Sequence, residues 1–386
     1  MHAPSLLDLP DDLLIQILLE LDAEDWLRLR LVSRAGLATV DGLTRWDSLW
    51  VQRAGQELSR FVQRVRGCRP AMLRLGGGAC WPAASEALRI VGPGVRDLFI
   101  DRAPVGQAQL NVIFEAMPRL RHLTVANVMG GAVALPAAAA SLDSLVLRSG
   151  HGPDIWDSDL CVSLGGLAAS TTLSRLVLVL DKPHGQLGSS LADARFHATL
   201  THLTAVQWGA FDLRHLQPFQ ELHTLVLHAA EFYVSPGVRL PSVRRLCVPY
   251  TLLDEALTMF PALDELFVYA TSSDDLFLVD LDLVAHLKCL SLFVRHDVKL
   301  LFMCESFEHF DAWALCQRFR LFCHDEVECI VTCDDLASAE FSLARTVHAP
   351  PPLGCEVMAA GCELSKIPWC PQHGFQPPNL FPLLSV

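Results

Sequence analysis

Apolar residues recur in one spacing through most of the chain. The frame is L-x-x-L-x-L, and valine or another apolar residue also fills its first, fourth and sixth positions. Because the fourth and sixth positions are two residues apart, they point to the same face of a β-strand, into a core. Clear copies begin at Val95, Leu120, Leu142, Leu173, Leu200, Leu222, Val243, Leu263 and Leu287. Imperfect copies lie at residues 73–75 and 327–332.

The segments between the frames predict how the strands connect. Most copies follow one another at intervals of about 20–29 residues, the period of leucine-rich repeats. A parallel neighbour requires the chain to return on the other side of the sheet. Gln109–Met117, Leu191–Ala198 and Leu253–Phe260 predict helices in such returns, and a proline stands two residues before several frames. We therefore expect an α/β solenoid with a parallel sheet on its concave face.

The pattern changes in two respects. Eight residues after the start of the frame, many leucine-rich repeats carry asparagine or cysteine, but this chain carries residues such as Ala103, Gly150 and Trp208. No asparagine ladder can form, so we expect irregular curvature. After residue 292 the frame lapses: residues 302–323 predict a helix, residues 326–332 a last strand, and the proline-rich chain from residue 349 a tail.

The first fifty residues have a helical pattern instead. Pro10 suits a first helical position, and Asp11 and Asp12 place negative charge at the positive end of the helix dipole. The following leucines and isoleucine form a broad apolar face. Three short helices cannot bury all of this apolar surface alone, so it must pack on the rest of the chain or on a partner.

Charge and composition exclude several classes of function. The 43 acidic and 30 basic residues give a formal charge of −13, which would repel a nucleic-acid backbone. The most apolar window, Leu276–Val294, contains Asp280, Asp282, His286 and Lys288, so we expect no membrane span. The first residues show no secretory pattern, and the 13 irregularly spaced cysteines are interpreted as reduced thiols. We expect the protein in the cytoplasm and/or nucleus.

In order and spacing, residues 5–50 resemble an F-box. Leu9-Pro10 and the apolar positions up to Leu21 are similar to its opening, and Leu49-Trp50 to its close. The whole chain resembles F-box proteins with leucine-rich repeats, of the fungal type. The resemblance implies a non-catalytic substrate-recognition subunit of a Skp–cullin–F-box ubiquitin ligase, in which the F-box binds a Skp-type adaptor that joins a cullin. The adaptor contacts that it implies are Leu9, Pro10, Ile17, Leu18, Leu21, Leu29, Val32, Ser33 and Trp50.

Two other hypotheses about the function remain open. The N-terminal helices could merely cap a free-standing repeat scaffold or inhibitor, as terminal repeats often do. A cluster of Cys355, Cys362, Cys370 and His373 could hold zinc, but its spacing is irregular. We find no phosphate-binding glycine loop and no nucleophile elbow, so we expect no enzymatic activity, no cofactor and no metal.

The residues that alternate with the core positions predict where a protein substrate binds. They face the open side of the sheet, carry few charges, and include aromatic residues at two ends. The alternative is that the proline-rich tail covers this strip. Because aromatic residues often anchor interfaces, the predicted substrate contacts are Phe99, Phe267, Tyr269 and Phe293.

These patterns divide the chain into four parts. Residues 5–50 form the three-helix F-box, and residues 51–94 link it to the array. Residues 95–332 form the leucine-rich-repeat solenoid, and residues 333–386 the tail containing prolines and cysteines.

Overall fold

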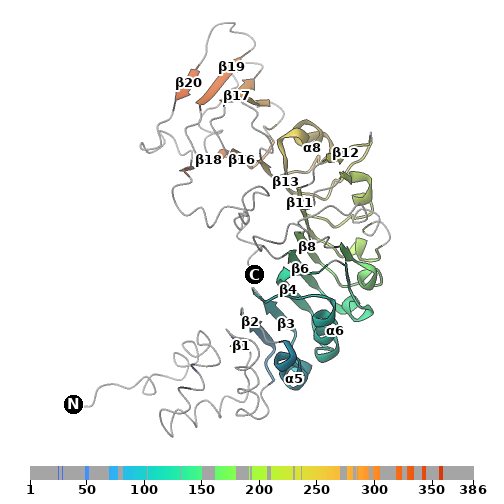
Figure 1. The fold of residues 1–386 in the computed structure, drawn as a ribbon. Helices are drawn as coiled ribbons and strands as arrows, with labels where there is room; N and C mark the ends of the chain where they lie inside the picture. The colour runs from blue at the N-terminus through green and yellow to red at the C-terminus, as the bar shows by residue number, and fades with distance from the viewer. Residues whose placement is uncertain are drawn as a thin grey trace, which may run out of the picture. The chain divides into compact units, whose positions relative to one another are not determined.

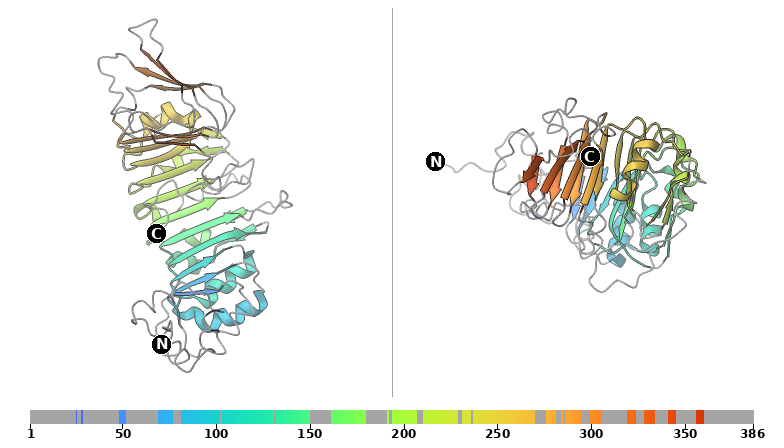
Figure 2. Two further views of the ribbon diagram at one scale, coloured as in Figure 1. Left: turned by 90° about the vertical axis from the view of Figure 1, so that its left-hand side faces the viewer. Right: turned by 90° about the horizontal axis from the view of Figure 1, so that it is seen from above.

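The computed structural model describes residues 48–51, most of 69–269, and separate segments between 276 and 359, besides the helical residues 25 and 28. Between residues 48 and 270 the longest gaps are 52–68, 150–160 and 180–190. The chain divides into two compact units, Met1–Leu200 (unit 1) and Thr201–Val386 (unit 2). Within each unit the strands run side by side in a mixed α/β arrangement (Figures 1 and 2).

In unit 1, the main sheet consists of six strands that pair in parallel. Their order is β1 (Ser48–Val51), β2 (Met72–Leu75), β3 (Asp97–Ile100), β4 (His122–Val128), β6 (Ser144–Ser149) and β8 (Arg175–Val179). The return segments contain α5 (Trp81–Val91), η2 (Gly92–Gly94), α6 (Gln107–Ala116), η3 (Ala137–Ser141), η4 (Gly165–Leu167) and η5 (Phe196–Ala198). Helices α5 and α6 lie on one side of strands β2 to β4 (Figure 1). A small second sheet pairs β5 (Ala132–Ala134) with β7 (Cys161–Ser163).

Unit 2 repeats this plan with parallel strands and shorter helices. Its main sheet has the order β9 (His202–Val206), β11 (Thr224–His228), β13 (Arg245–Pro249), β14 (Glu265–Tyr269), β16 (Cys289–Val294), β18 (Phe319–Cys323) and β21 (Glu356–Ala359). Between these strands lie η6 (Leu213–Leu216), η7 (Tyr250–Leu252) and α8 (Leu253–Met259). Two smaller sheets are formed by β10 (Ala210–Asp212) with β12 (Glu231–Tyr233), and by β15 (Leu276–Asp280), β17 (Lys299–Cys304), β19 (Glu328–Cys333) and β20 (Phe341–Ala344).

The register confirms the frame. Within each unit, the fourth-position residues of successive frames pair with each other, as Leu145 does with Leu176 and Leu225 with Leu246. Leu145, Leu176 and Leu225 are fully buried, and Leu266 is 1% exposed. The long parallel sheets therefore indicate a repeat solenoid whose core is formed by the predicted positions.

Backbone hydrogen bonds lock neighbouring repeats together where each strand begins. The N–H groups of Asp143 and Ser144 both donate to the carbonyl of Arg121, at 2.8 and 3.1 Å. The N–H groups at the equivalent positions of the frames beginning at Leu222, Val243, Leu263 and Leu287 make the same double contact with the preceding repeat. Because both donors are backbone N–H groups and the acceptor is a backbone carbonyl, any residue except proline can make these contacts, and the junction repeats along the array.

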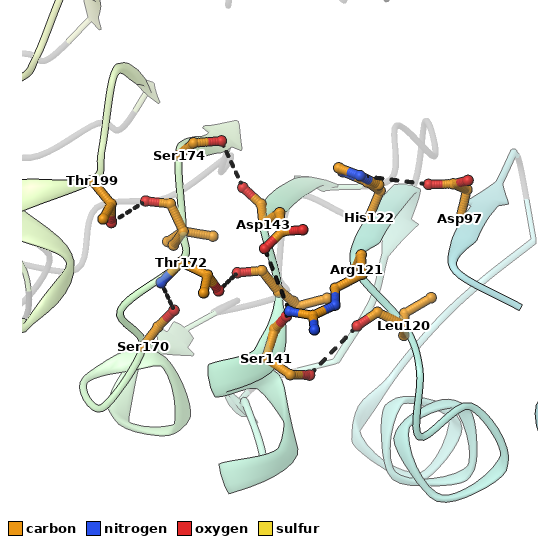
Figure 3. Close-up of polar contacts among 12 residues, drawn as sticks. Asp97, Leu120, Arg121, His122, Ser141, Asp143, Ser170, Thr172, Ser174 and Thr199 are labelled. Atoms are coloured by element: carbon orange, nitrogen blue, oxygen red, sulfur yellow. Dashed lines mark hydrogen bonds and ion pairs between the residues drawn. The ribbon is translucent and has the colours of Figure 1, made fainter.

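Side-chain hydroxyls form a second link between repeats in unit 1 (Figure 3). Thr199 Oγ1 donates to the carbonyl of Leu173 at 2.8 Å, and Thr172 Oγ1 to that of Leu142 at 3.1 Å. Ser141 Oγ makes the longest contact of this kind, 3.4 Å to Leu120 O. Each donor directly precedes a frame, and each acceptor is the first residue of the preceding frame. This hydroxyl ladder links repeats at a different position from an asparagine ladder.

Several predicted elements are confirmed and one is wrong. Helices α6 and α8 lie where 109–117 and 253–260 predicted them, and of 191–198 the structure describes the 3-10 helix η5. The predicted helix at 302–323 is wrong, because residues 299–304 and 319–323 form β17 and β18. Strand β17 pairs with the edge of β15, and β18 with the edge of β16. This pairing satisfies the backbone donors and acceptors at those edges. The strand predicted at 326–332 exists as β19 but pairs with β17 and β20, outside the main sheet.

The most apolar window of the sequence also forms strands. Within 276–294, the structure describes β15 and β16. Among the residues that the structure describes, no helix is long and apolar enough to cross a membrane. Strands β20 and β21 lie in the predicted tail, so part of it belongs to the sheets.

Candidate interaction surface

The third, fifth and seventh frame positions lie opposite the core, on a surface that we call the strand face. In unit 1 its accessibility changes from one end to the other. Met72, on β2, is 37% exposed and Phe99, on β3, is half-buried, whereas Val146 and Val177, on β6 and β8, are 7% and 6% exposed. The part of the strand face that is open to solvent therefore lies on the first strands of unit 1.

Trp50 stands at the start of this open part. It lies in β1, between the buried core residues Leu49 and Val51, and its ring is 5.4 Å from the guanidinium carbon of Arg74 on the next strand. The structure places Trp50 on the sheet, against Arg74, and its predicted contact with an adaptor stays a prediction. A guanidinium above an indole ring is a favourable cation–π pair.

Two arginines lie further along the strand face of unit 1. Arg148 occupies the seventh frame position on β6, and Arg175 the third position on β8. Burial lowers the pKa of the Arg148 guanidinium. Burial, and next the positive charge of Arg148, lower the pKa of Arg175. The two positive charges therefore act on each other in a half-buried setting.

Two pairs of oppositely charged residues lie on the strand face. His122 Nε2 lies 3.7 Å from Asp97 Oδ1, and Arg245 Nε lies 3.3 Å from Glu265 Oε2. The Nε atom of Arg148 is buried, and no described residue forms a hydrogen bond with it. A buried donor without an acceptor is costly, so Arg148 is the unusual charge of this surface.

In unit 2 the structure brings three of the predicted substrate contacts together. Phe267 and Tyr269 lie on β14, and Phe293 pairs with Tyr269 from the neighbouring β16. Phe267 is only 6% exposed. The fourth predicted contact, Phe99, lies in unit 1. Substrate binding by these four residues stays a prediction.

Tyr269 has a structural role that its position in the frame does not reveal. Its hydroxyl donates to the carbonyl of Leu227 at 2.8 Å. In this sheet such a carbonyl normally accepts from the backbone of the next strand, as Leu75 O does from Asp101 N at 2.8 Å. The equivalent donor for Leu227 would be residue 249, which is a proline and has no N–H group. The Tyr269 hydroxyl replaces the missing donor, and burial raises its pKa well above the usual range.

Two free cysteines lie on the described part of the strand face, the buried Cys247 and the half-buried Cys289. Cys247 is 3% exposed, and burial raises the pKa of its thiol, so it stays protonated and unreactive. Among the described residues, no cluster of histidine, cysteine and acidic side chains is suited to a metal. The proposed zinc cluster at 355–373 lies outside these residues. The surface is suited to binding, through packing and charge.

Comparison with known families identifies the N-terminal region. Residues 6–35 match the model of the F-box domain. The chain carries an F-box domain. No curated protein matches the chain.

F-box domains bind Skp-type adaptors and so join cullin complexes, generally as non-catalytic subunits that bring a substrate. The predicted contacts Leu9, Pro10, Ile17, Leu18, Leu21, Leu29, Val32 and Ser33 all fall in the matched range. They lie outside the residues that the structure describes, so their contact with an adaptor stays a prediction. Trp50 lies beyond the match.

Arg148 and the role of Tyr269 escaped the sequence analysis. The predicted binding surface included the seventh frame position of other repeats, among them Tyr269 and Phe293, but not Arg148, which stands at that position on β6. The alternation of the strand could have shown that Arg148 shares this surface. The missing N–H of Pro249 is visible in the sequence, but its replacement by a tyrosine 20 residues later depends on the sheet.

Proposed function

We propose that the chain is the substrate-recognition subunit of a Skp–cullin–F-box ubiquitin ligase. The F-box would hold the Skp-type adaptor, and the strand face of the repeats would hold a protein substrate. The match at residues 6–35, followed by a long parallel repeat array in the same chain, carries this proposal. The chain would act without a cofactor or catalytic residue, in the cytoplasm and/or nucleus.

The two proposed roles, adaptor binding by the F-box and substrate binding by the repeats, have a physical basis. An F-box module of three short helices has more apolar surface than it can bury alone, which suits docking on an adaptor. A parallel sheet of repeats offers a long surface whose side chains vary from repeat to repeat. One end of the chain can therefore bind a constant partner while the strand face determines the specific one.

Co-expression of the full chain with a Skp-type adaptor tests the proposal. The variant with Leu9→Ala and Pro10→Ala, and the variant Leu18→Asp, should each lose co-purification of the adaptor, because both remove apolar contact or place a charge in it. The control is Ile90→Asp, which places the same charge on α5, at a residue that is 56% exposed. It should bind the adaptor as the wild type does. Unchanged adaptor binding by both F-box variants would contradict the proposed function.

A free-standing scaffold or inhibitor is the second candidate. It is favoured by β1, which begins at Ser48, inside the range predicted for the F-box, and pairs with β2. The N-terminal module thus leads directly into the first strand, as a cap would. The same experiment separates the two functions, because a cap alone would not retain the adaptor.

A further inference from the structure

The open part of the strand face combines one arginine with apolar side chains from three neighbouring strands. In the register of the sheet, Trp50 on β1 pairs with Arg74 on β2, and Arg74 pairs with Phe99 on β3. Met72 lies two residues before Arg74 on the same face of β2 and is 37% exposed. A positive charge therefore lies between two aromatic residues, beside an apolar side chain that is open to solvent.

These residues are accessible, unlike the strand face of the later strands in unit 1. Arg74 is exposed, and Trp50 and Phe99 are half-buried. Val146, which stands on β6 at the same frame position as Phe99, is only 7% exposed. The first three strands therefore offer a contact surface that β6 does not.

Arg74 is available for a ligand and its side chain is already positioned. Its guanidinium lies 5.4 Å from the centre of the Trp50 ring, and no described residue forms an ion pair or a hydrogen bond with it. Stacking on an aromatic ring uses the face of the guanidinium and leaves the N–H donors at its edge free. Because the ring restricts the side chain before binding, less conformational entropy is lost when a ligand binds.

The sequence around this surface is positively charged. Residues 45–122 contain 12 arginines and six acidic residues, although the whole chain has a formal charge of −13. Within this range, Arg69 and Arg96 are exposed and form no ion pair with a described residue. The acidic residues that begin and follow β3, Asp97 and Asp101, are each already engaged in an interaction. An anionic ligand would therefore be attracted to this part of unit 1.

We propose that Arg74 binds a carboxylate of an acidic segment in the protein substrate, and that Met72 and Phe99 contact an apolar residue of the same segment. This rests on the proposed function and specifies the chemistry of the substrate that the repeats would take. The Nε and Nη groups of a guanidinium form a planar fork that fits the two oxygens of one carboxylate. The flanking side chains of Met72 and Phe99 supply the apolar contact.

The geometry of β2 determines the spacing of the two residues in the ligand. Met72 and Arg74 are two residues apart on a strand, and both a strand and an extended peptide rise about 3.3 Å per residue. A peptide lying along β2 with a carboxylate at Arg74 would therefore bring the side chain two positions away to Met72. The recognised segment combines an aspartate or glutamate with an aromatic or aliphatic residue two positions away.

A carboxylate suits this surface better than a phosphate or a nucleic acid. Arg74 is the one cation among the described strand-face residues of β1 to β3. A phosphate monoester carries about −1.5 to −2 charges and three acceptor oxygens, which need more donors than one guanidinium provides. A nucleic acid would meet the 37 acidic and 18 basic residues that lie outside residues 45–122.

Selection of binders from a displayed library of random peptides tests this inference. The bait is the full chain co-purified with its adaptor, as wild type and as the variant Arg74→Gln. The matched control is Arg89→Gln, which removes the same charge at an exposed residue of α5. The wild type and the control should enrich peptides with an acidic and an apolar residue two positions apart. Arg74→Gln should not.

Fluorescence anisotropy with one enriched peptide gives the magnitude. Arg74→Gln should bind it about tenfold more weakly or worse, the factor expected for one charge-assisted hydrogen bond. Changing the acidic residue of the peptide to its amide should cause the same loss on the wild type and no further loss on the variant. Arg74→Lys keeps the charge without the planar fork and should recover only part of the binding.

A second variant tests the apolar contact independently of the charge. Met72→Ala should weaken binding of the same peptide severalfold, because apolar contact area is lost. Trp50 is left unchanged in all variants, since it is also a predicted adaptor contact. A thermal midpoint equal to that of the wild type shows that a variant is folded.

Four results would overturn the inference: the wild type enriches no such peptides, Arg89→Gln loses binding as Arg74→Gln does, a phosphoserine peptide binds through Arg74 more than tenfold tighter than its glutamate counterpart, or a random RNA oligonucleotide binds more tightly than the peptide. Adaptor co-purification is recorded for every bait. If the wild type does not retain the adaptor, the proposed function fails. An adaptor-bound wild type that enriches no acidic peptides contradicts only the role of Arg74.

Discussion

Unit 1 and unit 2 differ at the junction between one repeat and the next. In unit 1, hydroxyls just before the frames, such as those of Thr172 and Thr199, bond to carbonyls of the preceding repeat. Charged side chains at the second frame position also link repeats, and more closely in unit 2. There Asp264 lies 2.9 Å from Lys288 and 3.5 Å from Arg244, whereas the described residues of unit 1 form one such pair, Arg121 with Asp143 at 3.6 Å. Thr172 and Thr199 are part-buried, whereas Lys288 is 74% and Arg244 57% exposed.

This difference separates two ways of joining repeats. A partly buried hydroxyl–carbonyl bond keeps its energy in any salt, because neither group is charged. An exposed ion pair is screened by water and salt and contributes little to the stability of the fold. The backbone bonds at the strand starts are the same in both units, so side chains alone create the contrast.

The largest expected effect comes from the core that both units share. Leu176→Ala in unit 1 and Leu225→Ala in unit 2 should each cost about 2–5 kcal/mol, because a cavity would replace a fully buried side chain. Denaturant unfolding measures the loss, and amide hydrogen exchange locates it. Each change should weaken protection mainly in its own unit, since repeats contact chiefly their neighbours.

Met72→Ala provides the control for this pair, because Met72 is 37% exposed on the opposite side of a strand. It should cost much less. A loss at Met72 as large as that at Leu176 would contradict the register.

The next largest effect is expected at the tyrosine bond of unit 2. Tyr269→Phe removes the hydroxyl that replaces the missing N–H of Pro249, so the carbonyl of Leu227 loses its partner, at a cost of about 1–3 kcal/mol. Pro249→Ala supplies the backbone donor and should restore part of the loss in the double variant. Tyr233→Phe, at a residue that is 56% exposed, is the control and should change little. Additive effects of Tyr269→Phe and Pro249→Ala would contradict this link.

The same tyrosine predicts a pH dependence. Burial raises the pKa of Tyr269, while in the unfolded chain a tyrosine ionises near pH 10. The stabilisation is therefore fully present below about pH 10 and is lost as the pH rises above that value. Tyr269→Phe should reduce the alkaline decline of the unfolding free energy, measured at several pH values. An equal decline in both proteins would show that the hydroxyl is not shielded.

Thr172→Val and Asp264→Asn test the contrast between the units directly. Thr172→Val keeps the shape and removes the hydroxyl bond, and should cost about 1 kcal/mol at low and high salt alike. Asp264→Asn should cost less, and its effect should shrink as salt is added. Chemical denaturation by urea at two salt concentrations measures both. A larger loss for Asp264→Asn at high salt would reverse the proposed ranking.

Replacing Arg148 should stabilise unit 1 slightly. Arg148→Met removes a buried, unsatisfied donor and a like-charge repulsion while keeping the apolar stem, so the unfolding free energy should rise by about 1 kcal/mol or less. The control Arg119→Met removes an exposed charge and should have no such effect. A clear loss of stability in Arg148→Met would mean that the guanidinium already has a stabilising partner.

The smallest effect is expected at the unit 2 residue that corresponds to the hydroxyl ladder. Ser242 directly precedes a frame, as Thr172 does, but its Oγ is buried and forms no hydrogen bond with the described residues. Ser242→Ala should therefore be neutral or slightly stabilising in a denaturation curve, unlike Ser141→Ala. Equal losses in both variants would show that the ladder continues into unit 2.

The core was predictable because the geometry of a β-strand determines the spacing of the apolar residues in the sequence. The frame identified Leu145, Leu176, Leu225 and Leu266 as core residues, since alternation and period follow from the backbone itself. The stretch 302–323 was misread because short apolar runs suit helices and strands equally, and only the free edges of neighbouring strands decide between them.

The candidate site was less predictable because its properties arise between repeats. The F-box was recognisable from the order and spacing of residues along a short part of the sequence. The aromatic residues Phe267 and Tyr269 were placed correctly on the strand face, but the bond from Tyr269 to Leu227 spans 42 residues and bypasses an intervening strand. Arg148 was missed because the absence of a partner is a property of the folded surface that no spacing records.

The double contact at each strand start has a consequence for how such a chain could evolve. Because two N–H groups of one repeat need only a single carbonyl of the repeat before it, neither side of the junction depends on a particular residue, provided that the donors are not proline. Duplicating or deleting a whole repeat within a unit would recreate the same junction at once, without compensating substitutions. The length of the binding surface can therefore change in steps of one repeat, while its side chains change one residue at a time.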